Sequence, residues 1–77
     1  MLSIAAAKKR PRKGQKVRWR YSGGIAEGTV ERVAEERIEI ETGDTTIVRN
    51  GTPEDPAVVI RQDSNPNRIL RLVSELL

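Results

Sequence analysis

The stretch from Lys13 to Val33, KGQKVRWRYSGGIAEGTVERV, decides the fold. In its first half, the apolar residues Val17, Trp19 and Tyr21 alternate with cations. This period of two places apolar side chains on one face of a strand and cations on the other. The paired glycines that follow predict a turn, because glycine adopts positive φ at no steric cost. A second strand then begins, so the stretch predicts a β-hairpin that opens a small, twisted barrel.

Short apolar runs separated by turn residues continue to the end of the chain. We expect strands over residues 15–21, 25–35, 37–42, 45–49, 57–62 and 68–73, and a helical turn over 74–77 that closes one end of the barrel. Gly28 lies inside the second of these strands and indicates a bulge or a sharp bend there. The pattern predicts an all-β chain folded as a small closed barrel.

One segment allows a second interpretation. Residues 31–41, ERVAEERIEIE, also fit a helix, because Glu31 and Glu35 stand at helical spacing. The period-two spacing of Ile38 and Ile40, both β-branched, favours a strand instead. We expect the strand.

The composition limits both the core and the chemistry. The 77 residues form one domain, and their core must be mostly aliphatic, because the chain has only two aromatic residues. The chain contains no cysteine and no histidine, so disulfides, Cys/His zinc sites and Ser-His catalysis are excluded. We expect the core to contain Val17, Trp19, Ile25, Val30, Val33, Ile38, Ile40, Ile47, Val58, Ile60, Leu70 and Leu72.

The net charge of +3 conceals a division along the chain. Residues 1–20 hold eight cations and no acid, whereas residues 21–77 hold six arginines and eleven acids. Such asymmetry indicates that one end contacts nucleic acid or another anionic surface. We expect residues 1–12 to be a basic flexible tail and residues 13–77 to be the barrel domain.

The strongest functional candidate is the run from Lys8 to Lys13, which has five cations in six residues. Such a run neutralises phosphates and releases counterions, which gives affinity without sequence preference. A solubilising tail and a nuclear targeting signal are the alternatives. Cations of the first strand extend the surface, and Tyr21 is the aromatic residue expected to be exposed for stacking. The predicted nucleic-acid-binding residues are Lys8, Lys9, Arg10, Arg12, Lys13, Lys16, Arg18, Arg20 and Tyr21.

The first-strand cations have another interpretation. They could instead pair with acids on neighbouring strands, and such pairs contribute only about 0.2–1 kcal/mol each. The candidate partners are Glu27, Glu31, Glu39 and Glu41.

The acids of the chain do not indicate an enzyme. Glu35 and Glu36 are adjacent on a predicted strand, so they point to opposite faces and cannot share a site. Asp55 precedes Pro56 in a loop, where we expect it to set a turn. We expect no catalysis, no metal, no cofactor and no small-molecule substrate. No stretch approaches the ~18 apolar residues of a membrane span, so we expect a cytoplasmic protein without membrane contact.

Three short motifs resemble the hypervirulence-associated Tudor-like domain family. They are Lys13-Gly14-x-x-Val17-x-Trp19, the segment from Gly24 to Gly28-Thr29-Val30, and Glu54-Asp55-Pro56-x-Val58-x-Ile60. The resemblance covers about residues 12–76 and implies a five- to six-stranded Src-homology-3-like (Tudor-type) barrel. The first two motifs are also similar to the KOW-type barrels of ribosomal and transcription-elongation proteins, which would imply contact with RNA.

Methyl-lysine recognition does not follow from the resemblance. An aromatic cage needs several ring faces around one cation, whereas Trp19 and Tyr21 are the only aromatic residues. We expect Trp19 to anchor the core and Tyr21 to lie at the rim. The leading hypothesis is a non-enzymatic module that makes weakly specific, electrostatic contact with RNA or DNA. The alternative is a protein-interaction module that uses a sheet edge or the acidic face.

Overall fold

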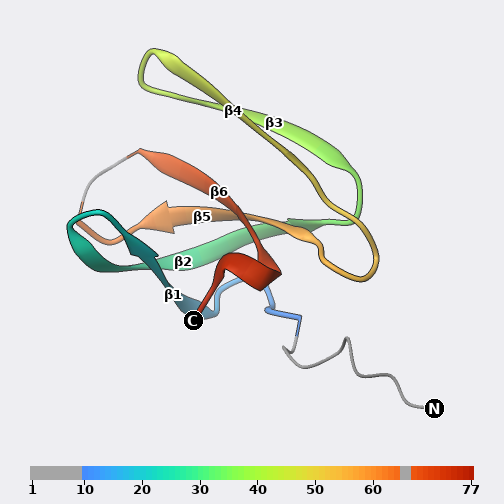
Figure 1. Ribbon diagram of the computed structural model, residues 1–77, viewed down its shortest axis with the longest axis horizontal. Coiled ribbons are helices and arrows are strands. Elements are labelled where there is room, and N and C mark those ends of the chain that lie inside the picture. The colour runs from blue at the N-terminus through green and yellow to red at the C-terminus, as the bar shows by residue number, and fades with distance from the viewer. Residues whose placement is uncertain (1–9, 65–66) are drawn as a thin grey trace.

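Six antiparallel strands follow the apolar alternation of the sequence (Figure 1). The computed structural model describes residues 10–64 and 67–77. The elements are β1 (Lys16–Tyr21), β2 (Gly24–Ala34), β3 (Arg37–Thr42), β4 (Thr45–Asn50), β5 (Ala57–Gln62), β6 (Arg68–Leu72) and a 3-10 helix η2 (Val73–Glu75). The all-β fold is confirmed, and every expected strand agrees with the observed one to within one residue at each end. The strand interpretation of residues 31–41 is confirmed, with a bend at residues 35–36.

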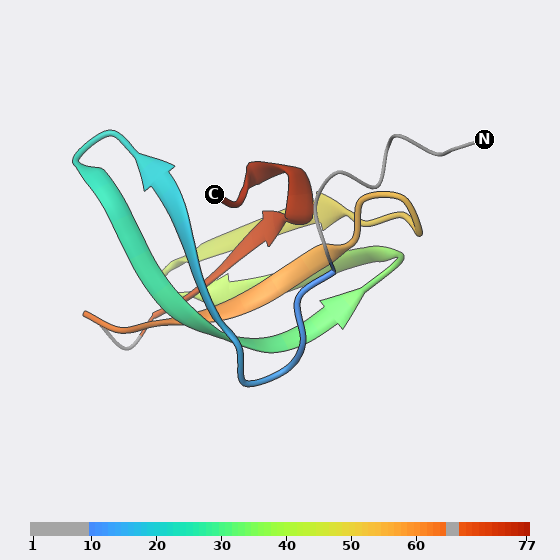
Figure 2. The same ribbon diagram turned by 90° about the horizontal axis from the view of Figure 1, so that it is seen from below.

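The strands form one curled sheet and one hairpin. In the sheet, neighbouring strands follow the order β1-β2-β5-β6, and β3 pairs with β4. Figure 2 shows the sheet curled around the C-terminal turn, which lies on its concave side. The β3–β4 hairpin lies against β6.

The sheet closes where the end of the chain meets β1. After η2, Leu76 forms an isolated β-bridge with Trp19, and the Leu77 N–H donates to the Arg18 carbonyl at 2.8 Å. The two edges of the sheet are thereby joined. The expected small barrel and its closing helical turn are confirmed, although the turn covers residues 73–75 and not 74–77, because Leu76 is extended and bridges to Trp19.

Strand β5 is buried on both faces, because each face packs against a different core. Neighbouring residues of a strand point to opposite sides, so Val58 and Ile60 face one core while Ala57 and Val59 face another. The inner core, on the concave side, consists of Val17, Trp19, Val30, Val58, Ile60, Val73 and Leu76. The outer core, between the sheet and the β3–β4 hairpin, consists of Ala34, Ile38, Ala57, Val59 and Leu70.

The expected core was wrong at Ile25, whose side chain is 46% exposed. Ile25 pairs with Arg20 near the tip of the β1–β2 hairpin, on the face that carries the cations of β1. Four other expected core residues are only half-buried at the edges of the two cores: Val33, Ile40, Ile47 and Leu72. Five residues of the buried hydrophobic core were missed by the sequence prediction: Ala34, Ala57, Val59, Val73 and Leu76.

The bulge in β2 lies after Gly28 and not at it. The register with β5 shifts between Val30 and Arg32. Two residues of β2 there oppose one residue of β5, so Glu31 and Arg32 share the outer face and Val33 returns to the inner one. Gly28 is instead a site of close approach: a Cβ atom there would lie 2.5 Å from Cγ2 of Ile60 and 2.6 Å from the Arg61 carbonyl oxygen.

Candidate functional site

The register of the sheet brings cations from three strands into one row. Side chains directly opposite each other in antiparallel strands lie on the same face. Lys16 of β1 pairs with Thr29 of β2, Thr29 pairs with Arg61 of β5, and Arg61 pairs with Arg68 of β6. This row crosses the whole sheet on the outer face.

The outer face is apolar where the β3–β4 hairpin covers it and cationic where it is open. We call this open part the basic face. Among the described residues it holds seven exposed cations and three acids, a net charge of +4. The cations are Lys13, Lys16, Arg18, Arg20, Arg32, Arg61 and Arg68, and the acids are Glu27, Glu31 and Asp63.

The three acids of the basic face each engage one cation. The Lys16 Nζ lies 2.5 Å from the Asp63 carboxylate, and the Arg18 Nε lies 3.5 Å from that of Glu27. The third pair joins Arg68 to Glu31. Exposed pairs of this kind contribute about 0–1 kcal/mol, so they hold their cations only weakly.

The acids that were expected to pair with the cations of the first strand were therefore predicted correctly only in part. Glu27 and Glu31 do pair with cations of the sheet, but Glu31 takes an arginine of β6 and not one of β1. Glu39 was a wrong choice, because it pairs at 2.9 Å with Arg37 on its own strand, in a hairpin that is not a neighbour of β1.

Glu31 lies among three cations. The Arg68 guanidinium donates from Nε to one carboxylate oxygen and from Nη2 to the other, the latter at 3.5 Å. This hydrogen bonding holds the pKa of Glu31 below its ordinary value against the opposing effect of burial, and the charges of Arg68, Arg61 and Lys13 lower that pKa further. The same carboxylate raises the pKa of Arg68.

One residue of the predicted basic run, Arg10, makes its side-chain contacts away from the basic face. The Arg10 guanidinium contacts the Glu35 carboxylate and donates to the Pro53 carbonyl at 3.1 Å. The backbone N–H of Arg12 donates to the Gln15 side chain at 3.0 Å, and Pro11 between them is buried. The chain is thus attached to the barrel from residue 10 onward. The predicted site residues Lys8 and Lys9 lie outside the described residues.

Tyr21 lies at the end of β1 and lines two hollows. It shares one, of about 240 Å³, with Trp19 and Ile69 on the inner side, and the other, of about 310 Å³, with Arg18, Glu27 and Asp63 of the basic face. The expected roles of the two aromatics are confirmed, since Trp19 is 2% exposed and Tyr21 is 52% exposed. A cage of several ring faces cannot be built from them.

Three cations of the basic face were not predicted: Arg32, Arg61 and Arg68. They come from the part of the sequence whose net charge is negative, so composition alone concealed them. The structure brings them to one face, on which only three of the eleven acids lie. Residues 36–50, the acidic hairpin, hold four acids and two arginines: Glu36, Glu39, Glu41, Asp44, Arg37 and Arg49.

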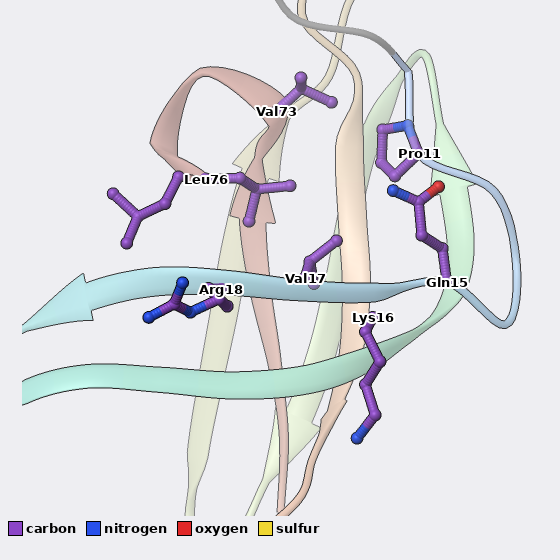
Figure 3. Close-up of a pocket in the computed structure, with 8 residues that line it drawn as sticks. Pro11, Gln15, Lys16, Val17, Arg18, Val73 and Leu76 are labelled. Carbon is purple, nitrogen blue, oxygen red and sulfur yellow. The ribbon is translucent and has the colours of Figure 1, made fainter.

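A cleft of about 350 Å³ lies between the start of β1 and the C-terminal turn. Figure 3 shows Val17, Val73 and Leu76 around it, with Pro11 and Gln15 at one side. Lys16 points away from these residues, toward the opposite face of β1. The cleft follows the edge of β1, and Lys16 and Arg18 of the basic face also contribute to its lining.

No helix among residues 10–64 and 67–77 is both long and apolar enough to cross a membrane.

Comparisons with known proteins agree with this architecture. No curated protein and no solved structure matches the chain. The family model described as the TUDOR domain of hypervirulence associated proteins matches residues 14–76, which include all six strands and the closing turn. The chain belongs to this family of hypervirulence-associated Tudor domains.

Proposed function

We propose that this small Tudor-type binding module contacts the phosphate backbone of RNA or DNA through its basic face. Tudor-like domains are typically binding modules without catalytic activity. The observation that supports nucleic acid as the partner is the collection of seven cations against three acids on one open sheet face. The eleven acids of the barrel segment lie mostly elsewhere.

Counterion release is the driving force that such a face supplies. Each phosphate neutralised by lysine or arginine releases condensed cations, so affinity falls steeply as salt rises. Six of the seven cations sit on four neighbouring strands of one sheet, which hold them in a fixed arrangement, and Lys13 lies in the turn before β1. Lys13 belongs both to the basic run of the sequence and to the basic face.

The contact is expected to be weakly sequence-specific. Base recognition needs hydrogen bonds to base edges or stacking on aromatic rings. Among the described residues, Tyr21 is the one exposed aromatic side chain, and it lies at the margin of the basic face. The basic face thus offers many charges for phosphates but only one ring for stacking with bases.

Fluorescence anisotropy with labelled single- and double-stranded RNA and DNA tests the proposal. The titrations are run at about 50 and about 200 mM salt, across which phosphate-dominated binding weakens by orders of magnitude. Arg61→Gln and Arg32→Gln remove cations that form no ion pair within the described residues, so they leave the fold intact. Each is expected to weaken binding and to reduce the salt slope by about 1.

The matched control is Arg37→Gln on the acidic hairpin. It makes the same change in net charge at a site away from the basic face, so affinity should change little. A loss equal to that of Arg61→Gln would show that only net charge matters. Absence of binding at the lower salt concentration would refute the proposal. The double variant Lys8→Gln with Lys9→Gln separately measures how much of the affinity comes from the N-terminal run.

The cleft at the edge of β1 supports the second candidate function, a protein-interaction module. An extended peptide could lie in this cleft and place an apolar side chain against Val17, Val73 and Leu76. Such binding would depend little on salt and would survive Arg61→Gln. The affinity of a peptide partner, measured at the same two salt concentrations, would therefore distinguish the two functions.

A further inference from the structure

Arg61 and Arg68 are a pair of like charges directly opposite each other on β5 and β6. Like charges at such positions repel and destabilise a sheet unless an anion lies between or beside them. Glu31 supplies that anion from β2, although β5 separates β2 from β6. Its carboxylate accepts from two nitrogens of Arg68 and lies within the electrostatic influence of Arg61 and Lys13.

The arrangement of these charged groups is suited to binding a phosphate. A guanidinium offers two parallel donors that fit a carboxylate or a phosphate equally well. The bulge of β2 puts Glu31 and Arg32 on the same face, so a fourth cation flanks the group. Glu31 thus occupies the position where a phosphate oxygen would be held by Arg68, with Arg61, Lys13 and Arg32 around it.

We infer that Lys13, Arg61 and Arg68 form a phosphodiester subsite that the Glu31 carboxylate fills in the free protein. Nucleic acid binding then exchanges one anion for another: the phosphate takes the donors of Arg68, and Glu31 moves into solvent. Glu31 holds Arg68 in place before binding and limits the affinity that the arginine pair can deliver. This inference rests on the proposed function and names one subsite of the basic face.

The exposure of the group permits such an exchange. The side chains of Glu31 and Arg68 are 27% and 53% exposed, so neither is sealed in the core. An exposed ion pair contributes little to stability, so a phosphate that accepts two charge-assisted hydrogen bonds from Arg68 can displace it. A purely structural ion pair would make no difference to the affinity for nucleic acid beyond its charge.

The test compares Glu31→Gln with Glu27→Gln. Glu27 is also on the basic face and also contacts an arginine, so the two variants gain the same charge in the same region. With a fluorescein-labelled single-stranded poly-dT oligonucleotide, Glu31→Gln is expected to bind more tightly than both the wild type and Glu27→Gln. The slope of log affinity against log salt should steepen by about 0.7, the value of one additional phosphate contact on a single strand.

The double variant Glu31→Gln with Arg68→Gln identifies the cause. The gain from Glu31→Gln should vanish when Arg68 is absent. Equal gains in Glu31→Gln and Glu27→Gln, or a gain that persists without Arg68, would overturn the inference while leaving the proposed function in place. Absence of binding by both the wild type and Glu31→Gln would overturn both.

An independent readout follows the Glu31 carboxyl carbon by NMR as pH is changed. In the free protein its pKa lies below the ordinary value. Saturation with the oligonucleotide should raise it, because Glu31 loses its hydrogen bonds to Arg68 and gains a neighbouring phosphate. An unchanged pKa in the saturated complex would contradict the exchange.

Discussion

Asp55 and Ser74 join the loop before β5 to the turn that closes the barrel. Oδ1 of Asp55 accepts from the Ser74 backbone N–H at 2.8 Å, and Oδ2 accepts from the Ser74 hydroxyl at 2.7 Å. Asp55 also sets the turn expected before Pro56, since its N–H donates to the Thr52 carbonyl at 3.1 Å. One half-buried carboxylate therefore fixes two segments that are distant in the sequence.

Asp55→Ala should destabilise the domain by about 1–3 kcal/mol, because it removes charge-assisted hydrogen bonds and leaves the Ser74 N–H without this partner. Chemical denaturation followed by circular dichroism measures the change. The neighbouring Glu54 is exposed and provides the matched control. Glu54→Ala should change the free energy of unfolding by less than about 0.5 kcal/mol. Equal effects of the two substitutions would contradict this role of Asp55.

Truncation of either core should be costly. Ile60 in the inner core and Leu70 in the outer core are fully buried. Ile60→Ala and Leu70→Ala should each lower the free energy of unfolding by about 2–5 kcal/mol, through lost burial and the cavity left behind. Ile25→Ala is the control, since this exposed residue should tolerate the same kind of change. If Leu70→Ala left the free energy of unfolding nearly unchanged, the outer core would not be what holds the β3–β4 hairpin to the sheet.

Gly28→Ala should destabilise the sheet although the backbone at Gly28 needs no positive φ. The added methyl would overlap the Ile60 side chain and, more seriously, the Arg61 carbonyl oxygen. Overpacking of this kind costs about 1–3 kcal/mol. Thermal unfolding of the variant measures the cost, with Glu27→Ala on the adjacent exposed position as the control. A melting temperature equal to that of the control would show that β2 and β5 separate easily at this point.

The pair of Glu31 and Arg68 should make stability depend on pH. The pKa of Glu31 is lowered in the folded protein, so its contribution to stability is present above the unfolded pKa and is lost as pH falls through the folded pKa. Glu31→Gln should therefore remove part of the decrease in melting temperature on acidification. The experiment compares the two melting curves from neutral pH downward. If the melting temperatures of the wild type and of Glu31→Gln fell equally on acidification, this contribution would be ruled out.

The strands of the barrel could be predicted from the sequence because each has its own local pattern. Alternation in β1, the glycine turn after it and the β-branched run in β3 do not depend on tertiary context. The burial of Val59 was missed although a signal was present. The continuous apolar run Ala57–Ile60 is typical of a strand that is covered on both faces.

The basic face could not be predicted from local pattern, because it depends on register. Arg61 and Arg68 lie side by side only because β5 and β6 pair as they do. The bulge had a signal in the spacing of Val30 and Val33, which can both face one core only if an extra residue lies between them. No signal in the sequence indicated that Arg10 contacts Glu35 and Pro53, because these segments share no common pattern.

The bridge between Trp19 and Leu76 places the single tryptophan of the chain at the seam where the barrel closes. Contacts between such distant residues carry a large loop-closure entropy and slow the folding reaction. The emission of Trp19 therefore reports seam formation without any added label, while far-ultraviolet circular dichroism reports the strands. If the two signals develop at the same rate, the barrel folds and closes in one cooperative step; if tryptophan emission lags, the sheet forms first and closes afterwards.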